Sequence, residues 1–199
     1  MIFYNKIKWV LGILMIFILI LSTNLIDRNN FIRVKDSVVT IYEDRLIAND
    51  LIFEMSKSVH EKEIAVALLD SVFFNQINLK INDDIQSLIS RFELTKLTPE
   101  ESKIFDELKS NMQSLIKAED VFVNSDLANE TEVVEYISKI KSNLGALSKV
   151  QLREGRRQMS ISKHAIDTVE LFTQIEIYLL VFLAIIIQII VMYKPKEKT

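Results

Sequence analysis

The chain has 199 residues, a formal net charge of −3, no cysteine, three glycines and two prolines. Without cysteine it can form no disulfide and no thiolate metal site, and its weakly acidic balance gives no basic surface for nucleic acid. Glycine and proline punctuate turns, so this scarcity predicts a few long helices rather than many short strands. We expect an all-α protein.

The first predicted element is an apolar segment over residues 9–26, WVLGILMIFILILSTNLI. Its length is close to the ~20 apolar residues that cross a bilayer. A cleaved signal peptide is the alternative. However, the apolar run exceeds the usual core of about 7–15 residues, and no clear small-x-small cleavage site follows it. We expect an uncleaved transmembrane helix preceded by a cytoplasmic segment, residues 1–8.

A second apolar segment covers residues 175–193 and is followed by the lysine-rich tail 194–199. Lys6 and Lys8 stand before the first span, so both spans have their positive charges on the terminal side. The positive-inside rule then places both termini in the cytoplasm of a bacterial inner membrane. Residues 27–174 are expected to form one periplasmic, or extracytoplasmic, domain.

The strongest helix start in this outer domain is KLTPEES, residues 96–102. Thr98 is a good N-cap, Pro99 suits the first helical position, and Glu101 completes a capping box. These residues predict a helix over about 99–124. The polar stretch NSDLANET then breaks the chain, and the last helix is expected over about 130–174 with Glu130 and Glu132 in its first turn.

The turn between the first two outer helices is harder to place. SVHE, residues 58–61, resembles a capping box, but a break there gives helices of unequal length. A turn near residues 70–76, in DSVFFNQ, lets the second helix return to the level at which the third begins. Short connections favour antiparallel neighbours. The expected fold is therefore an antiparallel up-down four-helix bundle flanked by two transmembrane helices.

Alternating spacings of four and three residues mark an apolar seam on the first and last outer helices. In the first helix Arg45 is the only charged member. Its seam is Val34, Val38, Ile41, Arg45, Ala48, Ile52, Met55 and Val59. In the last helix the seam is interrupted between residues 151 and 158. Its other positions are Val133, Ile137, Ile140, Leu144 and Leu147, then Ile161, Ala165, Thr168 and Phe172.

At a rise of about 1.5 Å per residue, both interruptions and the LTPEE segment fall at one height. We expect a charged cluster at the base of the bundle. Its acidic members are Glu43, Asp44, Glu100, Glu101 and Glu154, and its basic members are Arg45, Arg153, Arg156 and Arg157. One interpretation is a charge-paired layer that sets helix register at some cost in stability. The other is a pocket in which the four arginines bind a small anionic ligand, since arginine recognises carboxylates bidentately.

Other residues indicate no chemistry. Gly155, beside the cluster, costs about 1 kcal/mol in a helix interior relative to alanine and indicates close helix approach, a hinge, or tolerated slack. His60 and His164 lack metal-ligand spacing, and the sequence has neither a phosphate-binding loop nor a catalytic triad signature. Phe73 and Phe74 would close the bundle tip or belong to a ligand or partner surface. We expect no enzyme, no metal and no cofactor.

Two stretches carry a resemblance to a known family: Tyr42-Glu43-Asp44-Arg45 and Leu97-Thr98-Pro99-Glu100-Glu101. With the two spans, residues from about 5 to 192 resemble the four-helix-bundle sensor domain of bacterial methyl-accepting chemotaxis proteins. That family often has a proline where this chain has Ala48. It also continues into a cytoplasmic signalling module, which does not follow the second span here.

The resemblance implies a stand-alone sensory membrane protein. Such a protein would form a homodimer, bind a small molecule outside and signal through a separate membrane partner. The alternative is a structural or adaptor protein that binds a protein partner and no small ligand. Neither function involves nucleic acid.

Overall fold

The computed structural model describes residues 2–192, without the side chains of residues 2–11, 13, 187 and 189–192. Every regular element in this range is helical, which confirms the all-α prediction. The predicted cytoplasmic tail, residues 194–199, lies outside the described residues. The chain divides into two compact units. The described part of unit 1 is residues 2–38 with 159–192, and unit 2 is residues 39–158.

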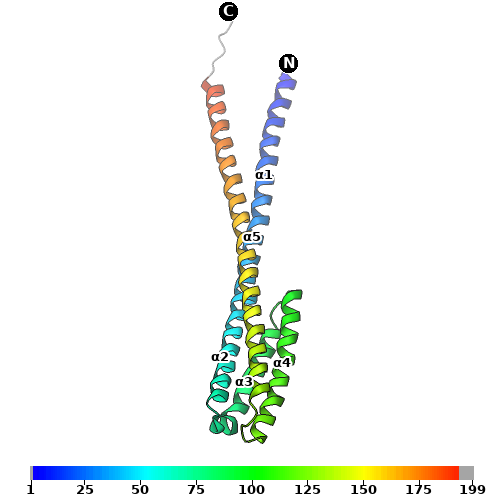
Figure 1. Ribbon diagram of the computed structural model, residues 1–199. Helices are drawn as coiled ribbons and strands as arrows, with labels where there is room; N and C mark the ends of the chain where they lie inside the picture. The colour runs from blue at the N-terminus through cyan, green and yellow to red at the C-terminus, as the bar shows by residue number, and fades with distance from the viewer. Residues whose placement is uncertain (1, 193–199) are drawn as a thin grey trace, which may run out of the picture. The chain divides into compact units, whose positions relative to one another are not determined.

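The elements are five α-helices and two short π-helical segments (Figure 1). In chain order they are α1 (Ile2–Thr40), η1 (Ile41–Leu46), α2 (Ile47–Ala67), η2 (Phe73–Ile77), α3 (Asn78–Glu93), α4 (Pro99–Asn124) and α5 (Thr131–Met192). A π-helical turn holds one more residue than an α-helical turn, and such turns are frequent at functional sites.

Unit 2 is a four-helix bundle built from η1 with α2, η2 with α3, α4, and the first part of α5. The α2–α3 and α4–α5 turns lie at one end of this unit, and the α3–α4 loop lies at the other (Figure 1). Its core consists of the inward-facing apolar side chains of all four helices. The most deeply buried apolar members include Ala48, Leu51, Met55, Val59, Ile85, Phe92, Phe105, Leu108, Leu115, Phe122, Val133, Ile140 and Leu147.

The predicted start of α4 is confirmed in detail. Thr98 accepts a hydrogen bond from the Glu101 backbone N–H, and the Glu101 carboxylate accepts one from the Thr98 backbone N–H, which together form the capping box. α4 runs from Pro99 to Asn124, as predicted. α5 begins at Thr131, so Glu132 is in its first turn and Glu130 precedes it.

The first turn lies slightly earlier than predicted, at residues 68–70 rather than within 70–76. SVHE is inside α2, as expected. Leu69, two residues after the end of α2, has a left-handed φ of 52°. The Asp70 carboxylate then accepts hydrogen bonds from the backbone N–H groups of Val72 and Phe73, both at 3.0 Å. Asp70 is therefore the N-cap that restarts the helix, so the turn ends where the prediction has it begin.

In unit 1 the predicted seam residue Ala165 is buried, but two other predicted seam positions, one on each helix, are wrong by one residue. Val38 is 55% exposed and Ile161 is 41% exposed, whereas Ser37 and Ser162 are buried. The heptad spacing slips by one residue between Ile41 and Arg45, where η1 accommodates an extra residue in its wider turn. A one-residue slip is not visible when the sequence is assigned to a single uninterrupted heptad repeat, because the spacing of apolar residues is regular on each side of the slip.

The structure places no close neighbour against Gly155. A Cβ added there meets no atom within 4 Å, so close helix approach within the described chain does not explain this glycine. We expect Gly155→Ala to raise the free energy of unfolding by up to ~1 kcal/mol, because glycine loses more backbone freedom in a helix. Thermal unfolding followed by circular dichroism measures this. Lys149→Ala, at an exposed position of the same helix, is the control. A loss of stability in Gly155→Ala alone would contradict the expectation.

One helix of the described chain, α5, passes a length and hydropathy test for a membrane span. Within Thr131–Ile186 its most apolar window has a mean hydropathy of 2.0, and none of that window is buried. The first predicted span lies in α1, where several side chains are outside the description. The two-pass topology and its domain boundaries therefore stay predictions.

Candidate functional site

Arg45 lies in η1 and is buried at the end of unit 2 that holds the α3–α4 loop. Its Nη1 donates to Glu101 Oε1 at 2.7 Å and to Gln151 Oε1 at 3.0 Å. Its Nη2 donates to the Lys96 carbonyl oxygen at 3.4 Å. Arg45 is 8% exposed, and Glu101 is fully buried. We call Arg45, Glu101 and Gln151 the base layer.

Glu101 has two roles in this layer. Its Oε2 accepts a hydrogen bond of 2.6 Å from the Thr98 backbone N–H, while its Oε1 accepts from Arg45. One carboxylate therefore both caps α4 and neutralises a buried guanidinium. Asp44 adds a third link, because its Oδ1 accepts from the Lys96 backbone N–H at 3.3 Å. The base layer thus joins η1, the α3–α4 loop, α4 and α5.

The other members of the predicted cluster do not enter the base layer. Arg153 pairs with Glu100, and both side chains are more than half exposed. Arg157 Nε pairs with Glu154 at 3.3 Å along α5. Glu43 and Arg156 are exposed. The four arginines therefore do not form one buried pocket in the described chain, and their role in ligand binding stays a prediction.

A second buried ion pair, which sequence reasoning missed, lies toward the opposite end of the bundle. Lys62 Nζ on α2 donates to both carboxylate oxygens of Glu119 on α4, at 2.7 and 3.0 Å. Asn78 on α3 accepts a hydrogen bond from Lys62 Nζ, and its Nδ2 donates to Glu119 Oε2 at 2.9 Å. Lys62 is fully buried, Glu119 is 2% exposed and Asn78 is 8% exposed. We call these three residues the distal triad.

A signal for the distal triad was present in the sequence. The seam predicted for the first helix ends at Val59, and the next position, three residues on, is Lys62. On α4 the seam positions are Glu101, Phe105, Leu108, Met112, Leu115, Glu119 and Phe122, all buried. An acidic residue therefore stands near each end of an otherwise apolar face, opposite a basic residue of the first helix.

Burial lowers the pKa of Lys62, because a charged ammonium loses its hydration in the core, and the charge of Glu119 and its hydrogen bond partly offset this. Asn82 Nδ2 also approaches Glu119 Oε2, at 3.4 Å, while the Asn82 Oδ1 is buried without a hydrogen-bond partner among the described residues. The distal triad is therefore a charged group of side chains enclosed by apolar ones.

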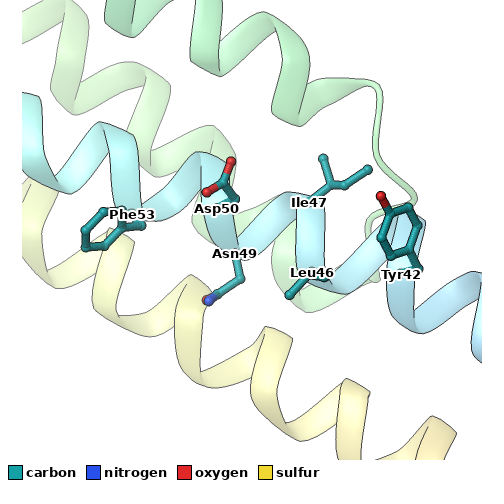
Figure 2. Close-up of a pocket in the computed structure, with 6 residues that line it drawn as sticks. All are labelled: Tyr42, Leu46, Ile47, Asn49, Asp50 and Phe53. Carbon is teal, nitrogen blue, oxygen red and sulfur yellow. The ribbon is translucent and has the colours of Figure 1, made fainter.

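Unit 2 also exposes apolar side chains on η1 and α2. An open groove of about 440 Å³ lies along this helix, and we call it the α2 groove. Figure 2 shows the side chains that line the groove. It is lined by Tyr42, Leu46, Ile47, Asn49, Asp50 and Phe53. Tyr42, Leu46 and Phe53 are each about 60% exposed. Asn49 and Phe53 also line a neighbouring groove, whose other side is formed by Lys141, Gly145 and Ser148 of α5.

Glu63 on α2 is bound to α5 by an exposed ion pair. Lys141 Nζ donates to both Glu63 oxygens at 2.8 Å, and the His60 ring contacts Glu63 at 3.1 Å. The hydrogen bond from Lys141, followed by that from His60, lowers the pKa of Glu63 below its ordinary value of 4.5. The pair therefore stabilises the fold above that ordinary value and loses its effect as pH falls through the lowered pKa.

We expect Glu63→Gln to cost about 0.2–1 kcal/mol of unfolding free energy at neutral pH, the range for solvent-exposed ion pairs. The difference from wild type should vanish in acid, where Glu63 is protonated in both folded and unfolded states. Urea unfolding at a series of pH values measures it. Glu61→Gln, on the same helix and exposed, is the control. A difference that persists at low pH would contradict this account.

The described residues contain no group of three or more His, Cys, Asp or Glu side chains arranged to hold a metal ion. Their polar clusters instead join helices to one another, at the base layer and at the distal triad. The candidate site thus has three parts: the base layer, the distal triad and the exposed α2 groove. An apolar core lies between the base layer and the distal triad.

Comparison with known proteins gives one match. The family model described as a four helix bundle sensory module for signal transduction matches residues 4–166. No curated protein matches the chain, and no solved structure matches it. The matched range covers most of the sequence and includes the whole bundle of unit 2. The chain belongs to the family of four-helix-bundle sensory modules for signal transduction.

Proposed function

We propose that this protein is a membrane-anchored sensor whose bundle lies outside the bacterial inner membrane and whose signal passes to a separate membrane partner. The family match carries the sensory part of this proposal. The two apolar segments and their flanking lysines support the anchoring and the topology. The alternative that the experiments below test is an adaptor, which binds a protein partner and no small ligand.

We further propose that the working form is a homodimer in which a second copy covers the α2 groove. Three exposed apolar side chains there, Tyr42, Leu46 and Phe53, are spaced so that they share one helix face, an arrangement that favours burial against another helix. The adjoining groove contains Gly145, which leaves room for close helix approach. The two adjoining grooves are lined by residues of η1, α2 and α5. These belong to the first and last outer helices, whose seams continue toward the predicted spans.

The proposed ligand is a small anion, such as an organic acid or an amino acid carboxylate. Arg153, Arg156 and Arg157 of α5 are exposed. Arg45 is neutralised by Glu101 in a buried pair, whereas Arg153 and Arg157 are more than half exposed in their pairs with Glu100 and Glu154. The exposed arginines are therefore the better candidates for first contact with such a ligand. In a dimer, arginines of two copies would contribute to one site.

A thermal-shift screen of the full chain in detergent tests the sensor function. The screen uses organic acids and amino acids, with neutral sugars as controls. A ligand present at a hundred times its dissociation constant should add ~2.7 kcal/mol of stability. The response should be lost in Arg156→Ala and kept in Lys80→Ala, an exposed residue of α3. If no compound stabilises the protein and crosslinking in membranes captures a different protein, the adaptor role is favoured instead.

Chemical crosslinking of the same preparation tests the dimer separately. We expect covalent dimers in the wild type and their loss in Phe53→Glu, which places a charge in the α2 groove. Leu79→Glu, at a residue of α3 that is 75% exposed, is the matched control and should still form dimers. A wild-type chain that stays monomeric would contradict the homodimer without affecting the ligand screen.

A further inference from the structure

The distal triad brings an amine, a carboxamide and a carboxylate into mutual contact inside a helical core. Lys62 Nζ contacts Asn78 Oδ1, and the Glu119 carboxylate accepts hydrogen bonds from both Lys62 Nζ and Asn78 Nδ2. We propose that these residues react with one another: Lys62 Nζ and Asn78 Cγ form an isopeptide bond with release of ammonia. The bond would covalently join α2 to α3.

The orientation of the Asn78 side chain suits this reaction. Its carbonyl oxygen must face the lysine and its NH2 must face Glu119, because the flipped amide would oppose donor to donor and acceptor to acceptor. The Asn78 carbonyl therefore contacts the nucleophilic nitrogen through its oxygen, and attack on Cγ needs Nζ to move from this oxygen to the face of the amide. The leaving nitrogen lies beside the carboxylate, at 2.9 Å. Glu119 bridges the nucleophile and the leaving group.

A lysine attacks a carbonyl only as the neutral amine, and burial shifts the protonation equilibrium of Lys62 toward that form. Lys62 is fully buried, and burial lowers its pKa. Glu119 Oε1, at 2.7 Å from Nζ, is placed to accept the proton directly. Desolvation and an adjacent base both activate nucleophiles in proteins.

The step balances within the triad. Nζ begins with three protons and ends with one, so Glu119 accepts two in turn. The neutral Nζ adds to Asn78 Cγ, and the carbonyl π electrons move to Oδ1. As the carbonyl re-forms, the Cγ–Nδ2 bond breaks, and Nδ2 receives a proton from Glu119 and leaves as ammonia. Glu119 retains the second proton. The step needs no oxidant, reductant or second substrate.

The protein environment favours the cross-link over hydrolysis. The seam neighbours of the triad are buried apolar side chains: Val59 and Val66 on α2, Ile81 on α3, and Leu115 and Phe122 on α4. They limit access of water to Asn78. Holding both reactants in contact removes the entropic cost of bringing them together. The product also replaces a buried ion pair by neutral groups, which avoids the desolvation cost of charge.

Mass spectrometry of the purified full chain tests the proposal. We expect the denatured protein to be lighter than its sequence by the mass of one ammonia molecule. A succinimide at an asparagine gives the same loss, so proteolytic mapping is the deciding measurement. It should yield a branched peptide in which the Lys62 segment is bonded to the Asn78 segment.

Two variants and a control complete the experiment. Lys62→Arg and Glu119→Gln should both lack the branched peptide, the first through loss of the nucleophile and the second through loss of the proton carrier. Asn82→Ala should keep it, because Asn82 contacts only Glu119 within the group, at 3.4 Å. Linear Lys62 and Asn78 peptides from wild-type protein, after prolonged incubation in the folded state, would overturn the proposal. A branched peptide that persists in Glu119→Gln would overturn the role given to Glu119. The wild-type map stands even if a variant fails to fold.

Discussion

Glu101→Ala should lower the free energy of unfolding by about 3–5 kcal/mol, the cost of removing one partner from a buried ion pair. The substitution leaves the Arg45 guanidinium in the core without its carboxylate, although Gln151 and the Lys96 carbonyl still accept from it. It also removes half of the capping box of α4. For a domain of this size the expected fall in Tm is about 10 °C or more.

Thermal unfolding of the full chain in detergent, followed by circular dichroism, measures this effect. Glu100→Ala is the matched control, since the neighbouring carboxylate pairs with Arg153 in an exposed position. The control should lose less than about 1 kcal/mol. If Arg45→Leu is combined with Glu101→Ala, much of the loss should be recovered, because no buried charge is left unpaired. A Glu101→Ala protein as stable as the Glu100→Ala protein would show that Arg45 reaches solvent when its partner is removed.

Local sequence patterns predicted much of the fold, because each depends on neighbouring residues. The capping box fixed the first residue of α4, since Thr98, Pro99 and Glu101 satisfy the free N–H groups of that helix end by themselves. Low glycine and proline content and the helical spacing of apolar residues predicted long helices. Arg45 drew attention because it alone breaks an apolar run, and it is indeed buried beside Glu101.

Two features could not be predicted from the sequence. One is which face of a helix is buried on the far side of a local irregularity, and the other is which distant charged residues pair. The π-helical turn of η1 moves Val38 out of the seam and Ser37 into it, and nothing in the residue types of IYEDRL marks an extra residue per turn. The cluster at the base was also predicted too broadly. The prediction grouped nine charged residues because they lie at the same height along the bundle. The direction in which each side chain leaves its helix also matters: Arg45 and Glu101 are buried, whereas Arg153 and Arg156 are exposed.

The distal triad leads to the second large effect. Glu119→Leu should cost about 3–5 kcal/mol, because the fully buried Lys62 then lacks a counter-charge. Lys62→Met should cost a similar amount, because the buried Glu119 carboxylate then lacks its counter-charge. Both values are measured against wild-type protein whose Lys62 peptide has been mapped. A cross-link closing a loop of about 15 residues would itself contribute ~3 kcal/mol to the reference.

Combining Lys62→Met with Glu119→Leu should not restore full stability, because Asn78 then keeps a buried amide that has lost both partners. An unsatisfied buried polar group costs about 1–3 kcal/mol. Adding Asn78→Leu should recover that amount and bring the bundle close to the stability of the wild type less the contribution of the cross-link, since well-packed apolar residues often replace a buried ion pair without loss. Urea unfolding of the wild type and of the four variants measures each step. A triple variant no more stable than the double would show that the amide finds water or Asn82 instead, and that the triad is less enclosed than its burial indicates.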